Sequence, residues 1–543
     1  MQKTGNIMEK LSRILRNIYT AIFLLMVGIL AVMSAFRSAY FDADRDIETP
    51  MYKWDKPLLV IGFYLVVLYV TARIGRLLNS KKARKACIAA ILFSLLLSLG
   101  FLFTLQSKPY MDCSALVELA TAFNKGDFSA LNSPARNTYL YIYPFQIGYI
   151  AYLQILFRIF GEGNYFAVQV INAFFAAWMV WSLIKIAGEL FASQERTGAE
   201  KTETEKDQIQ FMTAILLIFC LPLFINITFV YGDVPGWSLA AAAFYCLLHW
   251  AGNHNQYHFL VIATILFACG YLLKTNIAVF IVAAVIIIIL ESLRNKMWKP
   301  LLFAALCAVL PILVSAGVRN AYAKAAGIEE FPSGMPATCW IAMGMIEDET
   351  FENGWYSAYN IHTFEESGYD TKIADQMAKE VIRERISLFS HHPRYTAKFY
   401  LRKFISAWND PEYDSQIKMC WGTRRNEYIN PLARWLIWGA GAEILYWVMN
   451  LLHFVIFASC MAELVRTLKK KDDLSRMISY LILTTFGGML FHLLWETQAR
   501  YMIGYYCMLF PAAGAGIIHL SAKLRLIWED KAGKRLANAN LRS

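Results

Sequence analysis

Long apolar runs separated by polar connections dominate the chain. Runs at 18–36, 57–71, 277–290 and 300–318 approach or exceed the roughly 17 to 20 residues that a helix needs to cross the hydrocarbon core of a bilayer. The first run is longer than the apolar centre of a secretory signal, about 7 to 15 residues, so we expect a retained helix. The pattern predicts an all-α polytopic membrane protein.

Counting from a cytoplasmic N-terminus predicts about twelve transmembrane helices by this length criterion. Basic residues concentrate before the first span and in the connections that the count leaves inside, as the positive-inside rule requires. We therefore expect both termini in the cytoplasm and a multi-pass protein of the cell membrane, with the charge bias of a bacterial plasma membrane. The spans are expected near residues 18–36, 57–73, 86–105, 163–188, 209–230, 235–250, 258–275, 277–293, 300–319, 440–466, 477–496 and 501–521.

The stretch 144–160 is apolar enough to resemble a further crossing. At about 100° per residue, Gln146, Gln154 and Arg158 fall on one side of a helix, roughly opposite an aromatic and aliphatic face. We predict a helix that lies in the membrane interface. Counting it as a span would place the basic cluster at 469–471 outside, against the charge rule.

The spans divide the chain into five parts. Residues 320–435 form the longest polar segment, well beyond the roughly 12 to 15 residues of an ordinary connection, and are rich in Trp and Tyr. This composition predicts a folded domain rather than a disordered linker. The five parts are two N-terminal transmembrane helices in 1–85, a transmembrane core in 86–319 with a first long outer connection at 106–162, an extracytoplasmic domain in 320–435, C-terminal transmembrane helices in 436–522 and a basic cytoplasmic tail in 523–543.

Composition agrees with a membrane protein, because 57% of the residues are hydrophobic and 17% are charged, against about 25% charged in soluble domains. The formal charge of +11 does not indicate a nucleic-acid partner, since the basic residues lie at membrane edges. The ten cysteines show no metal or redox spacing, and most lie in or beside apolar runs. Cys339 and Cys420 lie in expected outer connections, where they could pair in an oxidising compartment.

Several motifs lie at the expected outer ends of spans. In KPYMDC, at 108–113, an acidic residue follows a span, and a short helix ending in Gly-Asp, a Tyr-Pro pair and an amphipathic stretch ending in Phe-Gly come after it. VYGDVPGW at 230–237 and ETQARY at 496–501 lie at later outer turns. These motifs resemble those of GT-C glycosyltransferases, in particular the protein O-mannosyltransferases and the lipid A aminoarabinose transferase. The resemblance covers residues 86–320 and, more loosely, the C-terminal spans, with two helices ahead of the family's usual first.

By this resemblance, Asp112 matches the family's catalytic carboxylate, a general base that takes the proton from an acceptor hydroxyl. Inverting glycosyl transfer from a phosphate needs one base near the nucleophile and cations near the leaving phosphate. Many such families carry a second acidic residue beside the first, whereas Cys113 follows Asp112 here. We expect no cofactor, and a divalent metal is not indicated. A solvated loop aspartate is the alternative.

Four further charged residues are candidates, each with a structural alternative. Asp233 is a second catalytic candidate, but a proline two residues later also suits a helix N-cap. Lys274 ends an apolar run, where it would hold a lipid phosphate or extend toward the interface. Arg500 suits bidentate phosphate recognition, although its i, i+4 spacing from Glu496 also suits a pair on a helix surface. Arg136 could assist at the phosphate or be a solvated loop charge.

Other polar and aromatic residues carry weaker signals. His391 and His392 lack partners at zinc spacing, so we expect them on the surface. The aromatic residues of the outer domain could stack on sugar rings, or they could pack the domain and anchor it at the interface. They are Trp340, Trp355, Tyr356, Tyr359, Trp408 and Tyr413.

An active site on the outer face has no access to nucleotide sugars, which are made in the cytoplasm. The resemblance implies a polyprenyl-phosphate sugar as donor, and the acceptor would be a polymer, glycolipid or protein of the cell envelope. A transporter or lipid flippase is an alternative, but such proteins place ionisable residues near the bilayer midplane and interrupt helices in matching halves. A polysaccharide polymerase or ligase is another. A carboxylate soon after a span, followed by an amphipathic helix, suits the transferase better.

Overall fold

The computed structural model describes residues 2–43, 49–74, 80–135, 138–191, 200–470 and 472–540. The structure is 79% helical with almost no sheet, as predicted for an all-α membrane protein. A two-stranded antiparallel hairpin, β1 (Arg37–Tyr40) and β2 (Met51–Trp54), joins the first two long helices. The Ala39 amide donates to the Asn409 carbonyl, so the hairpin is tied to the far end of the 320–435 segment.

Within the described residues, eight helices are long and apolar enough to cross a membrane, or ten if each of two bent helix pairs is one span. Many exposed side chains on these helices are apolar, such as Leu58 and Ile312, as lipid surroundings require. The long helices are α1 (Gln2–Phe36), α2 (Pro57–Ile74), α3 (Ser80–Leu105), α7 (Tyr165–Glu189), α12 (Ala278–Asn295), α13 (Lys299–Ala326), α20 (Ala440–Lys469) and α21 (Asp473–Leu494).

The two bent pairs break at 219–220 and 508–509, where the helix axis turns by 57° and 56°. The predicted twelve spans require α10 (Asp233–Gly252) and α11 (His258–Leu273) to cross as well. Both form helices, but α10 is buried in the bundle and α11 is short at 16 residues. The elements concerned are α8 (Glu200–Ile218), α9 (Leu221–Ile225), η4 (Asn226–Thr228), α10 (Asp233–Gly252), α11 (His258–Leu273), η5 (Thr275–Ile277), η6 (Ala499–Met502), α22 (Ile503–Cys507) and α23 (Phe510–Asn540).

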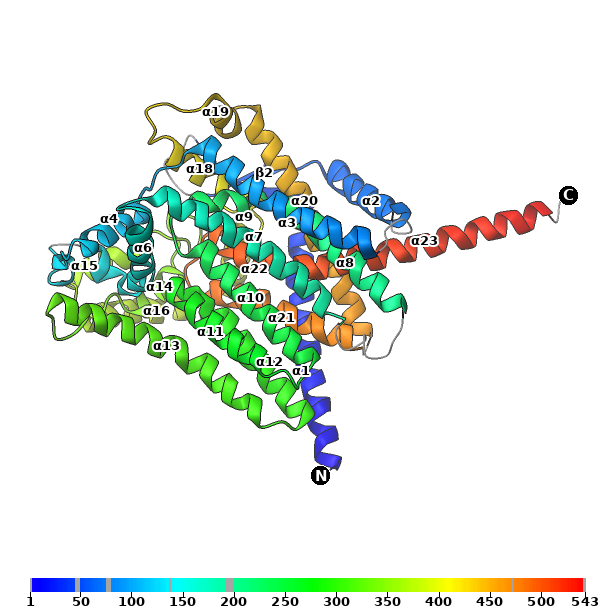
Figure 1. Cartoon of the computed structure of the whole chain (residues 1–543), viewed down its shortest axis with the longest axis horizontal. Helices are drawn as coiled ribbons and strands as arrows, with labels where there is room; N and C mark the ends of the chain where they lie inside the picture. Colours follow the sequence, from blue (N-terminus) through cyan, green and yellow to red (C-terminus); the bar gives the residue numbers. More distant parts are fainter. Residues whose placement is uncertain are drawn as a thin grey trace.

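The connections at 106–162 and 320–435 gather at one end of the helix bundle, here called the outer end (Figure 1). In the same view α23 extends away from that end. The first connection forms α4 (Asp112–Asn124), η1 (Ser129–Leu131), α5 (Thr138–Ile142), η2 (Pro144–Gln146) and α6 (Ile147–Phe160). The second forms α14 (Ala337–Met343), α15 (Tyr359–Glu366), α16 (Thr371–His391), α17 (Pro393–Trp408), α18 (Ser415–Thr423) and α19 (Pro431–Trp438).

The helix predicted over 144–160 forms, and it is not among the membrane-length helices. Two of the three predicted polar side chains, however, point into the protein. Gln146 donates to the Tyr231 hydroxyl, Gln154 bonds Asn124 and Tyr322, and both glutamines are buried. The two glutamines therefore anchor α6 to neighbouring helices. Arg158, the third residue of the expected polar face, is exposed like Ile159 and donates to the Asn124 side chain.

The suggested pairing of Cys339 with Cys420 is wrong, because both cysteines are free. Cys339 lies in α14 near the Ala374 carbonyl, whereas the Cys420 thiol donates to the Ala43 carbonyl. The two thiols belong to different packing clusters.

Candidate active site

A cavity of about 710 Å³ lies at the outer end, where several helices stop. Its wall is assembled from segments that follow α3, η4, α11, α13 and α21, together with α18. Aromatic side chains form a large part of the lining. The charged residues among the described lining residues are Asp112, Lys274, Arg319, Lys418, Glu496 and Arg500.

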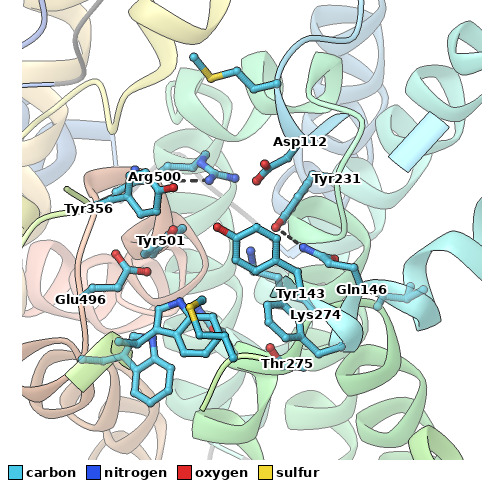
Figure 2. A pocket seen from close by; sticks show the side chains of 18 of the residues that line it. Asp112, Tyr143, Gln146, Tyr231, Lys274, Thr275, Tyr356, Glu496, Arg500 and Tyr501 are labelled. Carbon is cyan, nitrogen blue, oxygen red and sulfur yellow. Dashed lines mark hydrogen bonds between the residues drawn. The ribbon is translucent and has the colours of Figure 1, made fainter. Parts of the chain in front are cut away.

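Asp112 is the first residue of α4, at the turn that leaves α3. Met111 adopts φ 46°, a left-handed conformation that is uncommon outside glycine and that clusters at functional sites. This turn directs Asp112 into the cavity beside Arg500 and Tyr231 (Figure 2). The next residue, Cys113, is buried behind it, and burial raises the pKa of its thiol.

Asp233 forms ion pairs with two of the candidate cations, Lys274 and Arg500. Lys274 Nζ lies 2.6 Å from Asp233 Oδ1, and Arg500 Nη1 lies 2.6 Å from Asp233 Oδ2. The Asp233 side chain is 3% exposed, so it is held behind the two cations rather than on the cavity wall. A buried carboxylate between two buried cations fixes their positions and leaves a net positive charge toward the cavity.

Close packing of α10 against α11 creates this geometry. A Cβ atom on Gly232 would lie 1.9 Å from the Leu273 carbonyl oxygen, and one on Gly236 would lie 2.9 Å from Lys274 Cβ. Only glycine permits so close a backbone approach. The end of α11 therefore lies against the start of α10, and Lys274 reaches Asp233.

Aromatic rings surround the two cations. Lys274 Nζ lies 4.5 Å from the Tyr231 ring centroid, and the Arg500 guanidinium carbon lies 4.6 Å from that of Phe229. Burial raises the pKa of Tyr231, and the nearby Asp112 charge raises it further. Burial also lowers the pKa of Lys274, while Asp233 and Asp112 oppose that change. The site thus holds its charges in a poorly hydrated environment, where electrostatic interactions are strong.

The structure brings Asp112, Lys274 and Arg500 into one cavity, with Asp233 directly behind the cations. Two structural alternatives are wrong. Gly232, not Asp233, is the N-cap of α10, and Asp233 makes no capping hydrogen bond. Glu496 and Arg500 do not share a helix face, because α21 ends at Leu494 and Arg500 is ion-paired with Asp233.

The remaining candidates lie elsewhere. Arg136 lies outside the described residues. His391 and His392 are exposed at the end of α16, as expected. Among the predicted aromatic residues, Trp340 and Tyr356 line the cavity, whereas Trp408 and Tyr413 are buried in the protein core.

Two cavity cations were missed by sequence reasoning. Lys418, on α18, lies 4.6 Å from the Trp421 ring centroid. Nothing in the polar 320–435 segment distinguishes it, because only the tertiary fold carries α18 to the cavity. Arg319 is a charge at the outer end of the predicted 300–319 span. Lys274 was identified because it ends an apolar run, and the same feature could have identified Arg319.

Residues 203–316 match a family model described as dolichyl-phosphate-mannose-protein mannosyltransferase. The matched segment runs from α8 into α13, so it contains Asp233 and Lys274 but not Asp112 or Arg500. Comparison with curated proteins and with solved structures finds no match.

Proposed function

We propose that this protein transfers a sugar to a cell-envelope acceptor at the outer membrane face. The family match supports the starting point, a GT-C glycosyltransferase that uses a lipid-linked sugar. The donor is a polyprenyl-phosphate sugar. The observation that carries the proposal is the meeting of one carboxylate, Asp112, with Lys274 and Arg500 in a single cavity, although these residues come from distant parts of the chain. A cavity of this size suits a sugar phosphate.

In the proposed reaction, Asp112 acts as the general base. The acceptor hydroxyl oxygen attacks the anomeric carbon and forms the new glycosidic bond, while Asp112 accepts the hydroxyl proton. The bond between the anomeric carbon and the phosphate oxygen breaks, and polyprenyl phosphate leaves with the electron pair. Lys274 and Arg500 stabilise the charge that grows on that phosphate. Asp233 holds both cations and takes no proton.

The position of the cavity supports donor entry from the membrane. Its wall includes Tyr271 and Leu273 at the end of α11 and Arg319 on α13, a helix whose surface is mostly exposed and apolar. A long isoprenoid chain would remain in lipid while its phosphate reaches the cations. The proposal places this end of the bundle outside the cell.

Replacement of Asp112 by Asn tests the catalytic role. Asn keeps the size and most hydrogen bonds but cannot accept the proton, so sugar transfer should fall by roughly 10² to 10⁴. Purified protein in lipid nanodiscs is given a labelled polyprenyl-phosphate sugar and an envelope fraction from cells lacking the protein. Label entering that fraction is measured.

Asp127→Asn is the matched control, because Asp127 lies in the same outer connection and accepts a hydrogen bond from the Ser129 amide at 3.0 Å. Asn can accept the same bond, so this variant should transfer sugar at the wild-type rate. Full activity in Asp112→Asn would remove the catalytic role of the first outer connection and favour a transporter.

A further inference from the structure

We propose that Glu496, together with the stacked pair Trp340 and Trp495, forms the subsite that binds the hydroxyl groups of the donor sugar. This inference rests on the proposed function, because it assigns the part of the cavity beside the phosphate-binding cations. The subsite lies at the break between α21 and η6, and all three residues line the cavity.

Contacts with the 320–435 segment fix the backbone around Glu496. Lys403, buried on α17, donates to the carbonyls of Gly344, Leu493 and Trp495 at 2.6, 3.1 and 2.8 Å. A Cβ atom on Gly344 would lie 2.9 Å from the Glu496 nitrogen, so α14 packs directly against this loop. The loop therefore presents Glu496 in one position, which a binding residue requires.

The Glu496 carboxyl group has one oxygen without a protein partner. Its side chain is hydrogen-bonded to Tyr501, but Oε2 is buried and accepts no hydrogen bond. An ammonium group has three N–H donors, and Lys403 uses all three on backbone carbonyls. Arg500 is ion-paired with Asp233. A buried acceptor that is left unpaired destabilises the protein, so Oε2 is suited to a hydrogen-bond donor on a ligand.

The direction of the side chain agrees with this role. Figure 2 shows the Glu496 carboxyl group pointing toward the middle of the cavity from the wall opposite Gln146. Burial raises the pKa of Glu496 to about 7. Near neutral pH the group is thus often uncharged, which reduces its repulsion of a donor phosphate in the same cavity.

Trp340 and Trp495 supply an apolar surface beside the carboxyl group. Their ring centroids lie 5.7 Å apart with an interplanar angle of 15°, and Phe491 stacks on Trp495 at 5.3 Å. A sugar ring has apolar C–H faces and a polar rim of hydroxyl groups. An aromatic wall next to a hydrogen-bond acceptor matches both features, as in other small-molecule sites with few polar groups.

Binding measurements with the carrier alone and with two of its sugar-bearing forms test the subsite. Protein in nanodiscs is titrated with polyprenyl phosphate and, separately, with its mannosyl and glucosyl forms, and Kd is measured for each. In Glu496→Ala, binding of at least one sugar-bearing carrier should weaken by about 10- to 100-fold, the effect of losing a hydrogen bond to a charged or strongly polar group. Polyprenyl phosphate should bind as in wild type. Glu496→Gln, which still accepts a hydrogen bond, should lose less than Glu496→Ala.

Glu352→Ala is the matched control, because Glu352 is a buried glutamate outside the cavity that pairs with Arg402 at 2.5 Å. Its replacement should leave the affinities for both kinds of carrier unchanged in the folded fraction. Trp340→Ala should repeat the selective loss for sugar-bearing carriers. Equal affinities of Glu496→Ala and wild type for every sugar-bearing carrier would overturn the subsite alone. A wild-type protein that binds no carrier at all would overturn the proposed function instead.

Discussion

Glu412 lies in a buried acidic turn that supports the cavity from behind. The turn also contains Asp410 and Asp414, and all three carboxyl groups are nearly inaccessible to solvent. Asp410 accepts hydrogen bonds from the Glu412 and Asp414 amides, and Asp414 accepts one from the Arg500 amide at 2.9 Å. The turn thereby fixes the backbone of the cation that pairs with Asp233.

Glu412 should make the stability of the protein depend on pH. Burial raises its pKa from 4.5 to about 8, with Glu443 and Asp414 adding to the rise and Lys53 opposing it. Between these two values the folded state binds more protons than the unfolded state, so stability should fall as pH rises, by at most about 1.4 kcal/mol per pH unit from this group. Thermal unfolding in detergent from pH 5 to 8.5 measures the slope.

Glu412→Gln should flatten that slope, because glutamine does not titrate. Glu365→Gln is the control: its side chain is 44% exposed and is not among the charges that act on Glu412, so the slope should remain close to that of wild type. An identical slope in Glu412→Gln and wild type would show that Glu412 does not titrate differently on unfolding.

Single residues were predictable where a charge ends an apolar run. Lys274 carries that signal, whereas Asp112 and Arg500 were found in motifs at the expected outer ends of spans, and the three lie together in the structure. Glu496 was considered only as a helix-surface partner of Arg500, because the end of α21 before Trp495 is not visible in the spacing. Lys418 belongs to a segment without membrane periodicity, and a contact made only in the tertiary fold leaves no local pattern.

At the scale of elements, hydropathy predicted the long helices well, because lipid demands an apolar surface along a whole span. The breaks at 219–220 and 508–509 were not predicted, since short interruptions within apolar runs do not change their average hydropathy. The inward direction of Gln146 and Gln154 also depends on partners distant in sequence, namely Tyr231, Asn124 and Tyr322. Periodicity identifies the polar side of a helix, but not whether that side contacts water, lipid or another part of the protein.

The contact between α10 and α11 should be intolerant of any side chain at Gly232. A Cβ atom there would lie 1.9 Å from the Leu273 carbonyl oxygen, so Gly232→Ala must separate the two helices and displace Lys274. Misplacement of a catalytic group by about 1 Å can cost about 10²-fold in rate. Sugar transfer should fall by about that factor, with the unfolding temperature also lowered.

Gly317→Ala is the matched control for that substitution. Gly317 is also helical, on α13, and a Cβ atom there would have no neighbour within 4 Å. Transfer by Gly317→Ala should equal that of wild type. Wild-type transfer by Gly232→Ala would show that the close approach of α10 and α11 does not position Lys274.

For the whole molecule, the proposed orientation can be tested by labelling with an impermeant thiol reagent in intact cells. Asn132→Cys and His362→Cys introduce thiols at exposed positions of the two outer connections and should react. Glu203→Cys, at the other end of the bundle near Arg84, should react only after the cells are opened. Replacing the exposed Cys269 by Ser reduces the background. The reverse pattern would place the cavity in the cytoplasm.

The charges around the cavity have a consequence for turnover. Lys274, Arg319, Lys418 and Arg500 line it, whereas the nearby carboxylates are Asp112, Glu496 and, behind the wall, Asp233. A polyprenyl-phosphate sugar is a phosphodiester with one negative charge, but the phosphate monoester left after transfer carries about −1.5 to −2 at pH 7. Under the proposed function, the same excess of cations should hold the product more strongly than the donor.

Release of polyprenyl phosphate, rather than cleavage of the bond between sugar and phosphate, should therefore limit the steady-state rate of transfer. Rapid-quench measurements should show a burst of about one glycosylated acceptor per enzyme, followed by a slower linear phase. Added polyprenyl phosphate should suppress the linear phase by competing with the donor. A strictly linear time course from the first turnover would show that the cavity releases the more highly charged anion freely.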